Sequence, residues 1–140
     1  MDETKMSQET AALQRARLHL RSGRRRLRQG KLAAGISTIY DALISAMRWY
    51  GLTHRSELGL TDCGGLDDDR RLFRLLVEAG VIDSAFDFDR LQSFMEKAVT
   101  RQPFAFAWPE ELAAVEAQLA LLGVLPFDET SLPPEDPATF

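Results

Sequence analysis

The sequence predicts an all-α protein, an up-and-down four-helix bundle with an additional C-terminal helix. Five helical segments are expected, and four of them repeat apolar residues at steps of three and four, which places those residues on one face of a helix. No segment shows the alternation of polar and apolar residues that is typical of a half-buried strand. Most connections between the five segments are short, which favours antiparallel neighbours in a bundle.

The first two predicted helices cover residues 7–29 and 32–50, and Gly30 is expected to form the turn between them. The apolar stripe of the first is formed by Leu13, Ala16, Leu20, Gly23 and Leu27. The apolar face of the second is formed by Leu32, Ile36, Ile39, Leu43 and Met47, with Tyr40, Ile44 and Tyr50 beside it. Because its apolar face is so wide, the second helix is expected to lie at the centre of the bundle.

Residues 51–66 contain four glycines and no sustained period, so they predict a long loop. The single cysteine, Cys63, lies in this loop without a CxxC partner, which argues against a disulfide scaffold and favours a reducing, cytoplasmic environment. Asp67 is expected to cap the third helix, and Gly80 to end it in the left-handed conformation. Capping explains the run of three aspartates here without a metal ion, because the glycine and the distal glutamate of an EF-hand loop are missing.

The fourth helix is expected to begin at Ser84 or Asp87 and to end near Arg101, before Pro103. The stripes of the fourth and fifth helices consist of Phe88, Leu91, Met95 and Ala98, and of Leu112, Val115, Leu119 and Leu122. Pro109 suits the first turn of the fifth helix, and Gly123 suits its end.

Two parts of the chain differ in composition. Residues 1–125 are expected to form a single domain, since a chain of 140 residues can bury one core without disulfides. Residues 126–140 contain four prolines and four acids, which predicts an extended, weakly ordered tail. The N-terminus is polar and no apolar run reaches the roughly 20 residues of a membrane helix, so we expect no membrane contact.

Charge is distributed unevenly along the chain. Residues 1–48 carry a net charge of +6 and residues 49–140 a net charge of −10, and no basic residue follows Arg101. The segment "RSGRRRLRQGK", residues 21–31, has Arg or Lys at six of its eleven positions. An acid-only final third is not the pattern of a protein whose surface binds nucleic acid, so nucleic acid is not the favoured ligand.

Four arginines in the first predicted helix form a ridge beside its apolar stripe. Arg17, Arg21, Arg24 and Arg28 are separated by four, three and four residues. Like charges at these spacings repel each other on a helix, so we expect negative groups to face this arginine ridge. These groups are either phosphates of a nucleotide or nucleic acid, or carboxylates of a partner or of the acidic tail. His19, on the same helix, is expected to be packed or solvated.

Two segments resemble the HEPN superfamily: "LRQGKLAAGISTIYDALISAMRWYGL" and "LFRLLVEAGVIDSAFDFDRLQSFMEKA". The resemblance covers roughly residues 15–101. It implies a four-helix bundle that is often dimeric. It also implies one of two activities, because members of this superfamily either cleave RNA or act as non-catalytic modules that pair with small nucleotidyltransferases, RNA or nucleotides.

The catalytic pattern of that superfamily is an arginine followed after four to six residues by a histidine, near the start of a late helix. No histidine follows Arg101, and only Arg48 and His54, in "RWYGLTH", have the required spacing. We therefore expect a non-catalytic interaction module without enzymatic activity, cofactor or metal. It is expected to form a homodimer, and either to pair with a small nucleotidyltransferase or to bind a phosphate-bearing ligand through the arginine ridge.

Two alternatives remain open. The first is a HEPN-type ribonuclease in which Arg48 and His54, brought together across a dimer, position and protonate the scissile phosphate. The second is a tetratricopeptide-like interaction domain, since "RSGRRRLRQGKLAAGISTIYDAL" is similar to one such unit. A single unit cannot bury its own apolar face, and the chain contains no second copy.

Overall fold

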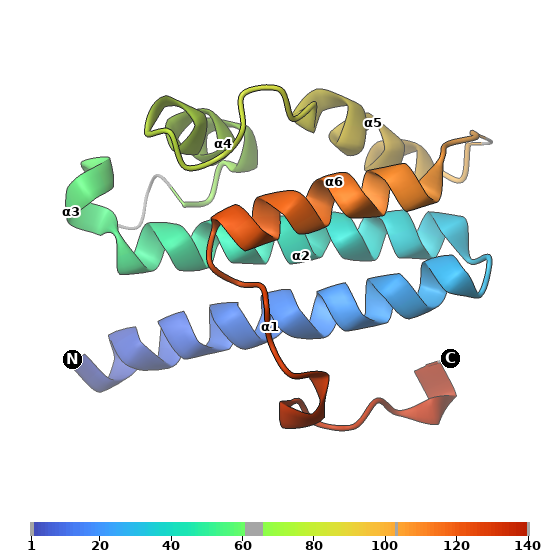
Figure 1. Cartoon of the computed structure of the whole chain (residues 1–140), viewed down its shortest axis with the longest axis horizontal. Coiled ribbons are helices and arrows are strands. Elements are labelled where there is room, and N and C mark those ends of the chain that lie inside the picture. Colours follow the sequence, from blue (N-terminus) through green and yellow to red (C-terminus); the bar gives the residue numbers. More distant parts are fainter. Residues whose placement is uncertain (1, 61–65, 103, 140) are drawn as a thin grey trace.

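The computed structural model describes residues 2–60, 66–102 and 104–139, and these residues form an all-α bundle (Figure 1). The α-helices are α1 (Asp2–Arg28), α2 (Leu32–Thr53), α3 (Arg55–Leu58), α4 (Asp69–Glu78), α5 (Phe88–Val99) and α6 (Trp108–Leu121). Two 3-10 turns follow in the tail, η2 (Glu129–Ser131) and η3 (Pro137–Thr139). No strand occurs among the described residues. The predicted all-α helical bundle is confirmed.

Helix α2 is the centre of the bundle. Twelve of its 22 residues are buried, and helices α1, α4, α5 and α6 all pack against it. Figure 1 shows α1 along one side of α2, α4 and α5 on the other side, and α6 in front of α2. Because the other helices surround one central helix, the arrangement favours a bundle over a stack of tetratricopeptide units, in which each unit contacts only its neighbours.

Small residues bring α1 and α2 unusually close together. A methyl group on Gly23 would lie 2.5 Å from Cγ2 of Ile39, and one on Gly35 would lie 2.5 Å from Cδ2 of Leu27. Gly30, with φ of +79°, makes the tight turn that returns the chain along α1. The helix pair therefore depends on glycine at two contact positions and at the turn.

Two expectations about helix ends need correction, the cap of the third predicted helix and the end of the fourth. The cap of α4 is Asp68, not Asp67: the Asp68 carboxylate accepts a hydrogen bond of 3.1 Å from the backbone N–H of Arg71. This shift by one residue places Asp69 inside α4, where its carboxylate faces α2. The fourth predicted helix begins after its Asp87 cap and ends at Val99, and Arg101 has a left-handed φ of 60° beyond it.

The long loop predicted over residues 51–66 is wrong in its first half. Helix α2 continues to Thr53, and α3 adds one further turn. Gly51 lies within α2, at a position that favours glycine because a methyl group there would be 2.5 Å from Cδ2 of Leu66. The predicted loop position of Cys63 and the helix stop at Pro103 lie outside the described residues.

One carboxylate is buried at the start of α6. Glu111 is 7% exposed and its Oε1 atom lies 2.9 Å from Nη2 of Arg90, whose side chain is half exposed. Burial raises the pKa of Glu111, and the Arg90 charge only partly offsets this effect. The ionised form of Glu111 is therefore less favourable in the folded chain than in the unfolded chain.

We expect the Glu111→Gln variant to be more stable than the wild type at pH 7. Because the pKa of Glu111 is raised on folding, the wild type loses stability as pH increases from 4.5 through the folded pKa, and the neutral amide avoids this loss. The advantage of the variant should therefore shrink as pH falls to 4.5. Urea unfolding between pH 4.5 and 7 measures the difference.

The matched control is Glu110→Gln, which removes an exposed carboxylate from the same first turn of α6. This control shows how the loss of one negative charge at the N-terminus of a helix changes the free energy of unfolding when the carboxylate is not buried. If the wild type is more stable than Glu111→Gln at pH 7, the ionised Glu111 carboxylate is not unfavourable in the folded chain and the prediction is wrong.

Candidate functional site

The predicted arginine ridge lies on α1 beside the buried residues Leu20 and Leu27. Its members Arg17, Arg21 and Arg24 are half-buried, whereas Arg28 is exposed. The half-buried members face the end of α6 and the tail that follows it, which runs back across α1 (Figure 1).

Arg24 lies between two carboxylates that are distant from it in sequence. Its Nε atom donates to Oε2 of Glu116, on α6, at 3.0 Å, and its Nη2 atom donates to the same oxygen. Its Nη1 atom donates to Oε1 of Glu129, in η2, at 3.2 Å. Arg24 therefore joins α1 to both α6 and the tail, and its side chain is only 20% exposed.

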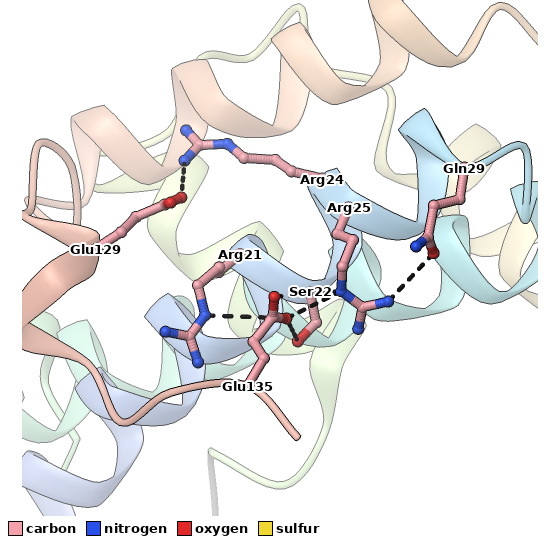
Figure 2. A network of polar contacts seen from close by, with 7 residues as sticks. All are labelled: Arg21, Ser22, Arg24, Arg25, Gln29, Glu129 and Glu135. Atoms are coloured by element: carbon pink, nitrogen blue, oxygen red, sulfur yellow. Dashed lines mark hydrogen bonds and ion pairs between the residues drawn. The ribbon is translucent and has the colours of Figure 1, made fainter. Parts of the chain in front are cut away.

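A second carboxylate of the tail, Glu135, is held by three residues of α1, which we call the Glu135 cradle: Arg21, Ser22 and Arg25 (Figure 2). Nε of Arg25 donates to both oxygens of Glu135 at 3.2 Å, and Oγ of Ser22 donates to Oε1 at 3.1 Å. Nε of Arg21 is 3.9 Å from Oε1, which is too long for a hydrogen bond. This Nε atom is buried and has no hydrogen-bond partner among the described residues.

The two ends of the arginine ridge, Arg17 and Arg28, differ in their contacts. Nε of Arg17 donates to the carbonyl oxygen of Val124 at 3.3 Å, and its guanidinium lies 5.3 Å from the centre of the Phe127 ring. Arg28 makes no polar contact within residues 2–60, 66–102 and 104–139. In this structure, the carboxylates that face the ridge are supplied by α6 and the tail of the same chain.

Two members of the Glu135 cradle, Ser22 and Arg25, are absent from the predicted set of binding residues. A signal for Arg25 exists in the sequence, since it follows Arg21 by four residues and precedes Arg28 by three. Ser22 carries no comparable signal, because an isolated serine on a helix is usually solvated. The weak order predicted for residues 126–140 stays a prediction, but Glu129 and Glu135 place the described part of the tail against α1.

Arg48 and His54 have separate neighbours. Arg48 donates to the carbonyl oxygen of Leu66 at 3.2 Å and to Oδ1 of Asp69 at 3.0 Å. The His54 ring stacks on Tyr50 with 3.9 Å between ring centroids, and its Nδ1 atom lies 3.0 Å from the Tyr50 carbonyl oxygen. Arg48 and His54 make no hydrogen bond with each other in the described part of the chain. A ribonuclease site built from this pair stays a prediction that requires a second copy of the chain.

Asp69 also connects Arg48 to a buried tyrosine. The Tyr40 hydroxyl donates to Oδ2 of Asp69 at 3.2 Å and accepts from Nε2 of Gln92 at 3.4 Å. Burial raises the pKa of Tyr40 to about 12, and Asp69 contributes in the same direction. The phenol therefore remains protonated at neutral pH, which fits a structural link between α2, α4 and α5.

A hollow of about 340 Å³ lies between α1, α2 and the tail. We call it the His19 hollow, after the histidine of α1 that lines it together with Arg21, Ser22 and Arg26. The α2 side chains that line it are Thr38 and Asp41, and the tail contributes Glu135 and Asp136. The hollow therefore adjoins the Glu135 cradle and shares Arg21 and Ser22 with it.

Burial lowers the pKa of His19, although the nearby Asp41 carboxylate acts in the opposite direction. His19 is therefore mainly neutral at pH 7. The pKa of Asp41 is raised by partial burial, and His19 opposes this shift. Asp41 is exposed as a whole, so water screens much of this interaction.

Within the described ranges, no three His, Cys, Asp or Glu side chains gather in a way that could hold a metal ion. The same part of the chain contains no helix with the length and apolar character needed to cross a bilayer. Comparisons with protein-family models, with curated proteins and with solved structures give no match, so the HEPN resemblance stays a prediction from the residues that carry it.

Proposed function

We propose that this chain is a non-catalytic helical binding module, in which the arginine ridge and the Glu135 cradle bind an acidic segment of a partner protein. The observation that supports the proposal most directly is the cradle. One carboxylate of an extended segment is held there by a two-oxygen contact from Arg25 and by the Ser22 hydroxyl. Clusters of arginine that recognise acidic motifs use the same chemistry.

The tail shows what kind of segment fits this surface. Its acids Glu129 and Glu135 contact the consecutive residues Arg24 and Arg25 of α1, and the residues between the two acids include Pro133 and Pro134. Proline restricts the backbone, so less conformational entropy is lost when such a segment is ordered on a surface. A partner segment is therefore expected to be extended, proline-containing and acidic at two separated positions.

A partner must compete with the tail of the same chain. Because the tail is covalently attached, its effective concentration at α1 is on the order of millimolar. A second copy of the chain carries the same tail, so exchange of tails would produce a homodimer. The HEPN resemblance makes a small nucleotidyltransferase the first other partner to test.

A labelled peptide with the sequence of residues 126–140 tests the proposal in fluorescence anisotropy. The receptor is the full chain carrying Glu129→Gln and Glu135→Gln, which keeps the fold but weakens the attachment of its own tail. We expect this receptor to bind the peptide about tenfold more tightly than the wild type, if the two tail contacts contribute about 1.4 kcal/mol together. Affinity should fall as salt is added, because the contacts are ionic.

The control peptide has the same sequence with its four acids replaced by amides, and it should not bind. Addition of Arg24→Gln and Arg25→Gln to the receptor should remove binding of the acidic peptide as well. Equal binding of both peptides, or an affinity that these arginine substitutions leave unchanged, contradicts the proposal.

A further inference from the structure

The His19 hollow has a cationic wall in which one donor lacks an acceptor. Nε of Arg21 is buried without a hydrogen bond among the described residues, although the Glu135 carboxylate is 3.9 Å away. The two oxygens of Glu135 are already engaged by Arg25 and Ser22. The Glu135 carboxylate therefore leaves one hydrogen-bond donor of this wall, Nε of Arg21, without an acceptor.

On the α2 side of the hollow, the hydroxyl of Thr38 makes two hydrogen bonds. Thr38 is 4% exposed, and its Oγ1 atom accepts from Nη1 of Arg26 at 2.5 Å while donating to the carbonyl oxygen of Ala34 at 2.7 Å. This pair of bonds fixes the guanidinium of Arg26 at the edge of the hollow. Arg21 and Arg26 thus reach the same space from two positions on α1.

His19 and Asp41 add groups that suit a hydroxyl. A neutral imidazole presents one N–H donor and one nitrogen acceptor, and an ionised carboxylate presents only acceptors. Both residues line the hollow, and each affects the protonation of the other. An anion at the arginine wall would therefore have hydrogen-bonding groups next to it that bind neutral O–H groups.

From this arrangement we propose that the His19 hollow binds a small phosphomonoester that carries free hydroxyl groups, and that Glu135 occupies the position of its phosphate in the unbound chain. A phosphomonoester has three terminal oxygens, one more than a carboxylate, so it can satisfy Arg21 in addition to Ser22 and Arg25. The volume of about 340 Å³ lies at the lower end of the range for small-molecule sites.

The inference shares the Glu135 cradle with the proposed function and adds His19 and Asp41, which line the hollow. Peptide binding also depends on Arg24, which does not line the hollow, whereas the phosphomonoester also requires His19 and Asp41. The two are therefore distinguished by their probes, an acidic peptide in one case and glycerol 3-phosphate in the other. A failed peptide experiment leaves the phosphomonoester experiment valid, and the reverse also holds.

The two histidines of the chain provide a selective NMR readout with the full chain and glycerol 3-phosphate as the probe. His19 lines the hollow, whereas His54 lies at the end of α2, about 20 Å beyond Asp41 along the helix. We expect a saturable shift of the His19 imidazole signals and none of the His54 signals. Glycerol alone should cause no shift, and inorganic phosphate should bind more weakly than glycerol 3-phosphate.

Substitutions test which side chains of the hollow contact the phosphate and which contact the hydroxyl groups. Glu135→Gln should tighten glycerol 3-phosphate binding roughly two- to fivefold, because a competing carboxylate is removed. The matched control is Glu129→Gln, which removes a tail carboxylate outside the hollow and should have a smaller effect. Arg21→Gln should weaken binding roughly tenfold or more. Asp41→Asn should weaken glycerol 3-phosphate but leave inorganic phosphate unchanged.

Three results would overturn the inference: no saturable shift of His19, equal shifts of His19 and His54, or equal effects of the Glu135 and Glu129 substitutions. Tighter binding of a phosphoserine peptide than of glycerol 3-phosphate would also overturn it, since the phosphate would then belong to a protein segment. Thermal unfolding of each variant verifies that it is folded. Glu135→Gln, a change in the tail outside α1–α6, keeps the test decisive if Arg21→Gln fails to fold.

Discussion

Replacement of Leu27 by alanine is expected to lower the free energy of unfolding by about 2–5 kcal/mol. Leu27 is 1% exposed and packs against Gly35 of α2, where an added Cβ would lie 2.5 Å from its Cδ2 atom. Its loss leaves a cavity that the closely packed pair cannot easily fill. Urea unfolding monitored by circular dichroism measures the effect.

Replacement of Gly35 by alanine should also destabilise the chain, by about 1–3 kcal/mol. In an exposed helix this change would stabilise by up to about 1 kcal/mol. Here the added methyl group would lie 2.5 Å from Cδ2 and 2.6 Å from Cγ of Leu27. The sign of the effect is therefore set by the contact and not by helix propensity.

The two substitutions together provide a sharper test. Leu27→Ala removes the two atoms closest to the Gly35 methyl group and leaves the backbone N of residue 27 at 3.2 Å, so the double variant should be more stable than the sum of the single effects, by about 0.5–3 kcal/mol. The matched control is Gly23→Ala, whose methyl group meets Ile39 instead. Its cost should persist in the Leu27→Ala background. Additive effects of Leu27→Ala and Gly35→Ala contradict the close contact between them.

Replacement of Arg24 by glutamine is expected to lower the free energy of unfolding by about 1–2 kcal/mol. The side chains of Arg24 and Glu116 are 20% and 30% exposed, so their pair is less screened than a surface ion pair. The substitution leaves Glu116 and Glu129 close together without a cation between them. This repulsion should also increase hydrogen exchange in η2.

Arg28→Gln is the matched control on the same ridge. Arg28 is exposed and lacks a polar partner in the part of the chain that the structure describes, so the change should stay within about 0.5 kcal/mol. The difference between the Arg24 and Arg28 variants should decrease at 1 M salt, where the Debye length falls to about 3 Å. Equal effects of the two substitutions would show that Arg24 does not hold α6 and the tail.

Much of the fold follows from local sequence patterns. The stripe of α1 predicted four of its buried residues correctly, Ala16, Leu20, Gly23 and Leu27, and the wide apolar face of α2 predicted its central position. Gly80 and Gly123 end α4 and α6 with positive φ, as their positions indicated. These features depend on residues within one or two helical turns of each other, which is why the sequence alone reveals them.

The glycine contacts between α1 and α2 were not predictable from the same patterns. Gly23 was expected only as a member of a stripe, and Gly35 was not distinguished at all, because both belong to helices in which glycine is unfavourable by propensity. Their role depends on Leu27 and Ile39 of the opposing helix. The cap at Asp68 was missed because three consecutive aspartates have the same capping propensity.

The sequence by itself determined that four arginines share one ridge of α1 and that negative groups should face it. Only the tertiary structure decided that Glu116, Glu129 and Glu135 are those groups, since each is at least 92 residues away from the arginine that it faces. Helical periodicity is set by neighbours along the chain. The pairing of distant charges depends instead on the direction in which α6 runs along α2 and on the turn at Gly123 that returns the tail across α1.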